Sequence, residues 1–510
     1  MLLPLEAKLH PNIPAETIQL VKDALSSGRT ELAKSISIAT GLTWYDLMAP
    51  AKNLYPTITP LRNSIPRIHR QNPGTAANWK VVQALTGSGW DAMGWVPEGQ
   101  RSARMSYTVA PAAAAYVTIG EEDQLSFEAE AAGVGFEDVN ATLTMRLLQK
   151  TMRKEEMGLL AGNATLLLGT PVTPTLSASG AGATLPALTY SVIVVALTLE
   201  GFRNSNLANG VATSKNITGA DGNTFTLNGG SSQKSAAATQ AVTLGQTLFA
   251  TTTPIQGAVA YAWFTGAAGS EKLEQITTIA SAAFAAPLVG GARQAATAVT
   301  ADCSANPNYA FDGLLTQALK PSNLAYINIL ANGVAGTGTP LTSSGRGSVN
   351  EIDVMLQQMW ELYKISPTVI YVNSQEQKNI TTKVLSNASG PLLRYDLPAT
   401  LQQGEAYGIT AGGVISYYYN PFAVDGGQKI PIKIHPDLPP GTIIGYAERL
   451  PEYYQSNEVP NVAEILTRRD YYRIDWPLRT RQREYGVYAE EVLAVYATFA
   501  MGVIGNIANG

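Results

Sequence analysis

The feature that most constrains this chain is a change in hydrophobic spacing between Met105 and Asn163. Residues 105–119 have the β-branched and aromatic composition of strands, interrupted by one proline. From Phe136 onward the apolar residues recur every three to four positions, as on one face of a helix, at Val139, Leu143, Leu147, Met157 and Leu160. We expect charges to fill the other face, at Arg146, Lys150, Arg153, Lys154 and Glu155. The helix should end at the C-terminal signal Gly162-Asn163, which predicts an α+β protein.

The residues before this stretch predict extended structure with little core of its own. Residues 1–70 are interpreted as an N-terminal arm, in which Pro56, Pro60 and Pro66 space out an apolar run. Regular prolines favour an extended backbone and remove hydrogen-bond donors from a ladder. Residues 71–127 then predict a long two-stranded excursion around a glycine-containing middle. We expect both segments to lie across neighbouring chains, because they gain little by folding on themselves.

Residues 170–305 differ from the rest of the chain in charge. Five basic and four acidic residues are the only charges between Pro171 and Thr300. Strand-like runs at 189–197 and 258–264 are separated by frequent Gly, Ser and Asn, which predicts an all-β sandwich. A disordered linker is the alternative, but the aromatic residues favour a core: Tyr190, Phe225, Phe249, Tyr261, Trp263 and Phe264.

Residues 306–450 predict mixed α/β structure. Helical spacing from Val349 to Tyr363 precedes a buried strand at 368–372. Asn373 then predicts the start of another helix, because Glu376 follows three residues later as in a capping box.

Residues 451–510 predict closing strands that are rich in charge. The nearly uncharged run 492–507 is shorter than the roughly 20 residues that a membrane-spanning helix needs. We interpret it as a buried strand followed by a short tail, and expect no membrane association.

Composition limits the function further. Charged residues make up 15% of the chain, against roughly a quarter in an average soluble protein. Assembly into something larger would hide much of such a surface; poor solubility as a monomer is the alternative. The net charge of −4 means that the chain has no overall excess of basic residues, which would indicate nucleic-acid binding. Cys303 is the single cysteine, so no disulfide can form within the chain, which suits a reducing compartment. The apolar start Met1–Leu5 is interrupted by Pro4 and followed by Glu6 and Lys8, so we do not expect a signal peptide.

No catalytic, cofactor-binding or metal-binding residue is predicted. Metal binding and general-base catalysis need clustered donors, whereas His10, His69 and His435 lie in three different segments. The sequence contains no phosphate-binding loop of the G-x-x-x-x-G-K-[ST] type and no G-x-S-x-G elbow. We therefore expect a structural protein and not an enzyme.

Two charged runs of opposite sign are candidates for an interface. Six arginines lie within sixteen residues, at Arg468, Arg469, Arg473, Arg479, Arg481 and Arg483, with acidic residues among them. An acidic counterpart begins at Glu121, Glu122 and Asp123 and continues to Asp138. Alternating signs in strands indicate cross-strand or intersubunit pairs, so our hypothesis is that the two runs meet between subunits. Two separate solvated faces, or arginines that bind nucleic acid, are the alternatives.

The order of these elements resembles that of a tailed-bacteriophage major capsid protein. The resemblance rests on the proline-spaced arm, the excursion, the helix ending in Leu-Leu-Ala-Gly-Asn, and the later Phe311-Asp-Gly-Leu-Leu. Weaker similarities follow at Ser366–Ser374, Ile430–Ile444, Tyr472–Ile474 and Tyr485–Tyr496, so that residues 45–165 and 308–500 are covered. The resemblance implies the capsid fold, with an E-loop at 71–127, the spine helix of the P-domain at 128–169, an A-domain at 306–450 and closing P- and A-domain strands at 451–510.

Residues 170–305 interrupt this family pattern. Their strand-like runs resemble immunoglobulin-like or fibronectin-type modules, whose two ends can lie close together, so the parent fold tolerates the insertion. We expect the module to project from the outer face of a shell. Some family members cross-link through an E-loop lysine, but no lysine lies between Val81 and Gln149. Here we expect that E-loop to hold its neighbours without a covalent bond.

The resemblance implies a shell of pentamers and hexamers around phage double-stranded DNA, in a virion made in the cytoplasm of a bacterial host. A separate scaffolding protein, a portal and an optional cement protein are the implied partners, and packaged DNA is contacted weakly if at all. Besides the charged runs, the expected intersubunit contacts are Tyr55, Leu61, Trp90, Trp95, Arg101, Arg104 and Tyr107. A phage tail, fibre or surface-adhesion protein is the alternative, which the Thr- and Ser-rich β region favours.

Overall fold

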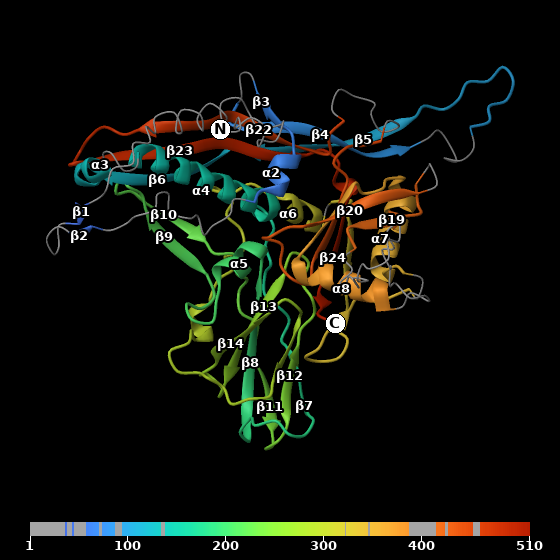
Figure 1. The fold of residues 1–510 in the computed structure, drawn as a ribbon. Helices are drawn as coiled ribbons and strands as arrows, with labels where there is room; N and C mark the ends of the chain where they lie inside the picture. The colour runs from blue at the N-terminus through green and yellow to red at the C-terminus, as the bar shows by residue number, and fades with distance from the viewer. Residues whose placement is uncertain are drawn as a thin grey trace, which may run out of the picture. The chain divides into compact units, whose positions relative to one another are not determined.

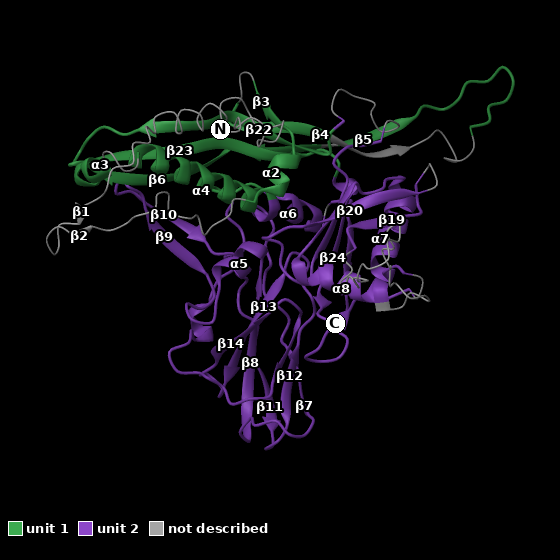
Figure 2. Cartoon of the chain, viewed as in Figure 1, with its two compact units in different colours: residues 1–159, 308–311, 461–497 green, residues 160–307, 312–460, 498–510 purple. Residues whose placement is uncertain are grey.

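The computed structural model of the 510-residue chain describes residues 36–37, 43–44, 58–70, 74–86, 94–133, 138–321, 323–344, 347–386, 415–423, 427–451 and 460–510. The chain forms two compact units (Figure 1, Figure 2). Unit 1 contains residues 1–159, 308–311 and 461–497, and unit 2 contains residues 160–307, 312–460 and 498–510. Each unit combines helices and strands, as the α+β prediction requires.

Unit 1 is built on a four-stranded sheet with the order β3-β22-β23-β6. Its strands are β3 (Arg67–His69), β22 (Ala463–Asp475), β23 (Gln482–Val495) and β6 (Val117–Ser126). β3 pairs parallel to β22, and the other two neighbouring pairs are antiparallel. The sheet therefore joins the end of the N-terminal arm to strands from the far end of the sequence.

The long helix α4 (Val139–Ala161) packs along this sheet. It begins where Asp138 Oδ1 accepts a hydrogen bond from the Ala141 backbone N–H at 3.0 Å, which is an N-cap interaction. Its interior is rich in residues of good helix propensity, and its apolar stripe faces the strands. The shared core contains Leu125, Leu143, Leu147, Leu148, Tyr471, Tyr485, Val487 and Ala489. The predicted helix is confirmed, although Phe136 lies outside the described residues.

The predicted two-stranded excursion is also present in unit 1. β4 (Ala76–Thr86) pairs antiparallel with β5 (Ser106–Ala115), with one register shift between Val82 and Ala84. Unit 1 also contains the short pair β1 (Ile36–Ser37) and β2 (Thr43–Trp44). Two further helices are α2 (Pro60–Ser64) and α3 (Phe127–Gly133).

Residues 170–305 lie in unit 2 and form two antiparallel sheets. One has the order β11-β8-β13-β14, from β11 (Ala238–Val242), β8 (Leu188–Leu197), β13 (Ala260–Gly266) and β14 (Lys272–Thr277). The other has the order β15-β12-β7, from β15 (Ser281–Phe284), β12 (Thr247–Thr251) and β7 (Thr175–Ser179). One buried core includes Tyr190, Val194, Leu248, Trp263 and Phe284, from both sheets. The predicted sandwich is therefore present.

The central strand β8 is buried on both faces, which explains its unbroken apolar run. Tyr190, Val192 and Val194 face the core between the sheets. The alternate residues Ile193 and Val195 belong to a second core, covered by a segment that includes the 3₁₀ helix η2 (Ala296–Ala298) and by the helix α5 (Leu199–Asn204). A separate hairpin is made by β9 (Ser214–Thr218) and β10 (Thr224–Asn228).

The rest of unit 2 is a six-stranded mixed sheet with the order β16-β24-β21-β18-β20-β19. Its strands are β16 (Tyr326–Ile329), β24 (Met501–Gly505), β21 (Ile443–Tyr446), β18 (Val369–Val372), β20 (Gln428–Ile434) and β19 (Tyr417–Asn420). The helices are α6 (Leu314–Leu319), α7 (Asn350–Tyr363), α8 (Ser374–Ser386) and η4 (Thr498–Ala500). β17 (Thr339–Pro340) and β25 (Ile507–Ala508) form a parallel pair.

Two local predictions in unit 2 need correction. The run 492–507 was expected to end in a tail, but it supplies β24, an interior strand of the mixed sheet. Asn373 does cap α8, since its side-chain oxygen accepts from the Gln375 N–H at 3.0 Å. Glu376 does not complete a capping box; its carboxylate instead accepts from the Gly441 N–H at 3.1 Å.

The two ends of the sandwich lie side by side. The Asn306 N–H donates to the Asn163 carbonyl at 2.8 Å, and the Asn163 side-chain amide donates to the Ser304 carbonyl at 2.7 Å. Asp312 then accepts from the backbone N–H groups of Ala164 and Thr165 at 2.8 and 3.1 Å. The chain thus leaves and re-enters the α+β framework at one place.

Candidate functional site

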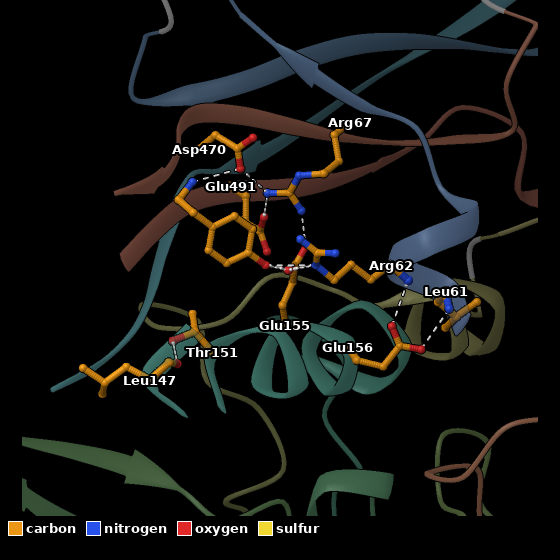
Figure 3. A network of polar contacts seen from close by, with 10 residues as sticks. Leu61, Arg62, Arg67, Leu147, Thr151, Glu155, Glu156, Asp470 and Glu491 are labelled. Carbon is orange, nitrogen blue, oxygen red and sulfur yellow. Dashed lines mark hydrogen bonds and ion pairs between the residues drawn. The ribbon is translucent and has the colours of Figure 1, made fainter. Parts of the chain in front are cut away.

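A buried network of charged side chains fixes the end of the arm within unit 1 (Figure 3). Arg62 comes from α2 and Arg67 from β3, while Glu155 lies on α4 and Asp470 and Glu491 lie on β22 and β23. The side chains of all five are at most 8% exposed. We call these five residues the arm anchor.

Arg67 is the centre of the arm anchor. Its Nη2 lies 2.8 Å from Asp470 Oδ1 and 2.9 Å from Glu491 Oε2, and its Nη1 is paired with Glu155. A planar guanidinium is suited to this role because it donates in several fixed directions at once. One arm residue thereby holds carboxylates from α4, β22 and β23 together.

Arg62 provides the second cation of the arm anchor. Its Nε donates to Glu155 Oε2 at 2.8 Å and to the Tyr471 hydroxyl at 3.0 Å. The Tyr471 hydroxyl in turn donates to Glu155. Both guanidinium groups lie over the Tyr471 ring, at 5.1 Å for Arg62 and 5.2 Å for Arg67. A cation over an aromatic face is stabilised by the ring quadrupole.

Glu156, the neighbour of Glu155, fixes the backbone of the arm. Its Oε1 accepts from the Leu61 N–H at 2.9 Å and its Oε2 from the Arg62 N–H at 2.8 Å. These are N-terminal N–H groups of α2, which have no partner inside so short a helix. The carboxylate also matches the positive end of the helix dipole.

Burial dominates the electrostatics of the arm anchor. Burial opposes the charge on Arg67, but Glu155, Glu491 and Asp470 outweigh it, so the pKa of Arg67 is raised above its ordinary value. Burial, together with the nearby charge of Glu155, raises the pKa of Glu491 to about 8, against the opposing influence of Arg67 and Arg62. A removed partner would leave a charge buried without compensation, which is the expensive case for a buried ion pair.

The arm anchor was not predicted from the sequence, and the predicted position of Glu155 was wrong. Glu155 was expected on the solvent face of the long helix, but it is 1% exposed. The available signal was spacing: Glu155 follows Leu148 and Thr151 and precedes Leu159 on the buried stripe of α4. A carboxylate on an apolar stripe requires a buried cation, and two arginines lie close together in the arm.

The predicted contact residues fall into three groups. Tyr55 and Trp90 lie outside the described residues. The expectation that Leu61 meets a neighbouring subunit is wrong, because Leu61 is 0% exposed within its own unit. Trp95, Arg101, Arg104 and Tyr107 are exposed, and they belong to an unbroken run of exposed residues from 94 to 108. Residues 106–108 of this run begin β5 and pair with β4, and Figure 1 shows the rest of the run extending beyond that pairing. We call it the exposed loop.

The two charged runs meet, but within one chain. Antiparallel pairing of β23 with β6 places Tyr485 opposite Asp123 and Val487 opposite Glu121. At the end of this pairing, Arg481 forms an ion pair with Glu128 at 2.7 Å and Arg483 with Glu130 at 3.3 Å. The intersubunit hypothesis is therefore wrong for these two pairs.

Several other members of the charged runs also have partners in their own chain. Glu121 pairs with Lys154 at 2.5 Å, and Glu122 accepts from the Trp476 ring N–H at 3.0 Å. Arg468 pairs with Glu490 and Arg473 with Asp475, at 2.5 and 2.8 Å. Arg469 lies over the Tyr472 ring at 5.5 Å, and Arg479 is exposed in the connection between β22 and β23.

Within the described residues, no group of three or more His, Cys, Asp and Glu side chains is arranged to hold a metal ion. His69 is exposed on β3, whereas His435 is fully buried and its Nδ1 accepts from the Asp437 N–H at 3.1 Å. Among the helices of the described part, none is long and apolar enough to cross a membrane.

Comparison with known proteins gives similarity in structure only. The sequence matches no protein-family model and no curated protein. The structure is similar to the Cyanophage A-1(L) capsid asymmetric unit (11% identity, 92% of this chain and 98% of that one, TM-score 0.41). It is also similar to the capsid of Myoviridae Phage XM1 (8%, 92% and 99%, 0.40) and to the capsid of a native GTA particle (10%, 92% and 98%, 0.39).

Proposed function

We propose that this chain is the major capsid protein of a tailed bacteriophage, whose copies assemble as hexamers and pentamers into an icosahedral shell around double-stranded DNA. The observation that carries the proposal is the exposed loop, whose residues from 94 to 108 are all solvent-accessible in a single chain. Trp95 is 92% exposed, Tyr107 66% and Met105 63%. Large apolar side chains so completely exposed indicate a surface that another molecule covers.

The hairpin of β4 and β5, which carries the exposed loop, favours a second copy of this chain as the molecule that covers the loop. A two-stranded ribbon is marginal in water without a further strand or helix against it. Beyond their own pairing, β4 and β5 make few contacts with the rest of unit 1, one of them the hydrogen bond from the Trp79 ring N–H to the Val495 carbonyl at 3.1 Å. Packing on a neighbouring subunit would stabilise both hairpin and neighbour, and many modest contacts add up in a closed lattice.

The arm anchor fits this role because it makes the start of the excursion rigid. Residues 58–70 are tied to α4, β22 and β23 immediately before β4 begins. A loop that reaches a neighbour must leave its own subunit from a fixed position, since ordering it at assembly costs conformational entropy. In this proposal β4, β5 and the exposed loop form the E-loop, and α4 is the spine helix of the P-domain.

The two-sheet insertion is proposed to be an immunoglobulin-like module on the outer face of the shell. Its low charge and adjacent ends support an added module, and a cement protein is its proposed partner. A separate scaffolding protein and a portal complete the assembly, and the role needs no catalysis. The proposed location is the virion, after synthesis in the bacterial cytoplasm.

Electron microscopy of the purified chain tests the proposal. We expect closed shells from the unaltered protein. Trp95→Ala with Tyr107→Ala should abolish shells with little effect on the thermal unfolding of the chain, because both side chains are largely exposed in the single chain. Leu244→Ala with Val289→Ala is the matched control, since these sandwich residues are 77% and 69% exposed. The control should assemble normally.

Filaments from the unaltered protein would instead support the alternative of a tail, fibre or surface-adhesion protein. Discrete small particles under all assembly conditions would contradict both readings. If the double variant of Trp95 and Tyr107 formed shells equally well, the exposed loop would no longer support the proposal.

A further inference from the structure

The charges of the arm anchor do not balance. Two guanidinium groups, Arg62 and Arg67, face three carboxyl groups, from Glu155, Asp470 and Glu491. The neighbouring Glu156 does not compensate, because it is itself acidic and accepts backbone N–H groups of α2. With every group ionised, these five residues hold a net negative charge in a site whose side chains are at most 8% exposed. Burying an uncompensated charge is costly, and a carboxyl group avoids that cost by taking up a proton.

The hydrogen bonds indicate which carboxyl group holds the proton. Glu491 is 0% exposed, and only its Oε2 is bonded, to Arg67 Nη2. Its Oε1 is buried and accepts no hydrogen bond among the described residues. Glu155, by contrast, uses both oxygens, with Arg67 on one and Arg62 and Tyr471 on the other. Asp470 Oδ1 accepts from Arg67 and from the Tyr471 N–H. Glu491 is thus the least compensated carboxyl group of the three.

We propose that Glu491 is protonated at neutral pH and that the arm anchor is a proton-dependent latch, which holds residues 58–70 when Glu491 is neutral and loosens when Glu491 ionises. The charged groups that act on Glu491 are Arg62 from α2, Arg67 from β3 and Glu155 from α4. Asp470 from β22 shares the Arg67 Nη2 group with Glu491. Ionisation adds a negative charge beside Glu155 and Asp470 without adding a cation. Because burial is the main cost of this charge, release of the three-residue strand β3 and the five-residue helix α2 would lower that cost by admitting water to Glu491.

The environment of Glu491 agrees with this geometry. Its burial and the charge on Glu155 raise its pKa to about 8, above the ordinary range of a glutamic acid. The proton is therefore held through neutrality and lost under mildly alkaline conditions. This latch goes beyond the proposed capsid role: it concerns how the arm is held in one subunit, whatever that subunit assembles into.

Hydrogen exchange of the full-length chain tests the latch. Exchange of peptides covering residues 58–70, corrected for the intrinsic pH dependence of exchange, should accelerate by up to about tenfold between about pH 7 and pH 9. In Glu491→Gln, which keeps the shape of the neutral acid, the corrected exchange should not change over that range. Glu490→Gln is the matched control: the adjacent carboxylate pairs with Arg468 away from the anchor, so its pH dependence should match that of the unaltered chain.

Infrared spectroscopy of the unaltered chain provides a second readout that does not depend on a variant folding. The C=O stretch of a buried protonated carboxylic acid should be present at neutral pH and should disappear as the pH rises through the alkaline range. Burial also raises the pKa of Glu376 and of Glu200, so the contribution of Glu491 is the part of the band that Glu491→Gln lacks. Absence of the band from the unaltered chain at neutral pH, or equal pH dependence of exchange in Glu491→Gln and the unaltered chain, would overturn the proposal.

Discussion

The carboxylate of Glu156 lies 2.8 Å from the backbone nitrogen of Arg62, a residue 94 positions earlier in the chain. One glutamate on the long helix therefore provides the N-terminal hydrogen bonds of a short helix in the arm. Glu156 is 0% exposed, so no solvent replaces it if it is lost. The arm is therefore held through its backbone N–H groups as well as through the side chains of its two arginines.

Glu156→Ala is expected to lower the free energy of unfolding by about 2–4 kcal/mol, because each buried donor left without a partner costs roughly 1–3 kcal/mol. Urea denaturation measures this loss. Arg153→Ala, an exposed residue of the same helix, should change the free energy by less than about 0.5 kcal/mol. Equal effects of the two substitutions would show that Glu156 does not support the arm.

Arg67→Met is expected to cost about 3–5 kcal/mol, since it leaves Glu155, Asp470 and Glu491 buried with only Arg62 as a cation. Arg67→Lys should retain part of this stability, because an ammonium group keeps the charge but cannot reach three carboxylates with a planar fork. Thermal unfolding of the three proteins gives the ranking. A lysine variant as stable as the unaltered chain would mean that charge alone, without the geometry of arginine, stabilises the anchor.

The arm anchor also shows what the sequence could and could not predict. The helix 139–161 and the strands of the sandwich follow from local spacing, because each buries one face or both against a large core. The burial of Glu155 depends on Arg67, 88 residues away, and that of Glu376 on Gly441, 65 residues away. No local period contains such information. The pairing of Arg481 with Glu128 likewise depends on the register of β23 against β6, which is a property of the sheet topology.

Stability should depend on pH in a direction set by Glu491. Its pKa is raised in the folded chain, to about 8, so between its ordinary value and about 8 the folded state binds more protons than the unfolded state. The free energy of unfolding should therefore fall as the pH rises through this range and level off above it. The pKa of Glu376 is also raised by burial, which adds to the same trend. Chemical denaturation at a series of pH values, with Glu491→Gln for comparison, measures the slope; a slope unchanged in the variant would contradict the assignment.

Arg481→Ala should have almost no effect on the stability of the chain. Arg481 and Glu128 are 80% and 62% exposed, and ion pairs in solvent contribute between nothing and about 1 kcal/mol. The expected loss is below about 0.5 kcal/mol by denaturation at moderate salt. A larger loss would indicate that the turn between β22 and β23 depends on this pair. The Arg468–Glu490 pair, whose glutamate is 12% exposed, provides the more buried comparison.

We expect Asp312 to contribute most to the stability of the place where the chain enters and leaves the sandwich. Its Oδ1 accepts from the N–H groups of Ala164 and Thr165, and its Oδ2 lies 2.9 Å from the Thr165 hydroxyl and 2.5 Å from Lys320 Nζ. Asp312→Ala removes all of these acceptors and leaves a largely buried ammonium group unpaired, so we expect a loss of about 3–5 kcal/mol.

Asp312→Asn should lose less, because an amide oxygen still accepts from the two backbone N–H groups. Lys320→Met removes only the ion pair, and a cycle of single and double variants should give a coupling of about 0.5–3 kcal/mol between Asp312 and Lys320. Limited proteolysis should cut Asp312→Ala faster within residues 162–170 and 302–313, where the two crossings between framework and sandwich lie. Unchanged proteolysis at both crossings, with a full loss of stability, would place the effect of Asp312 elsewhere in unit 2.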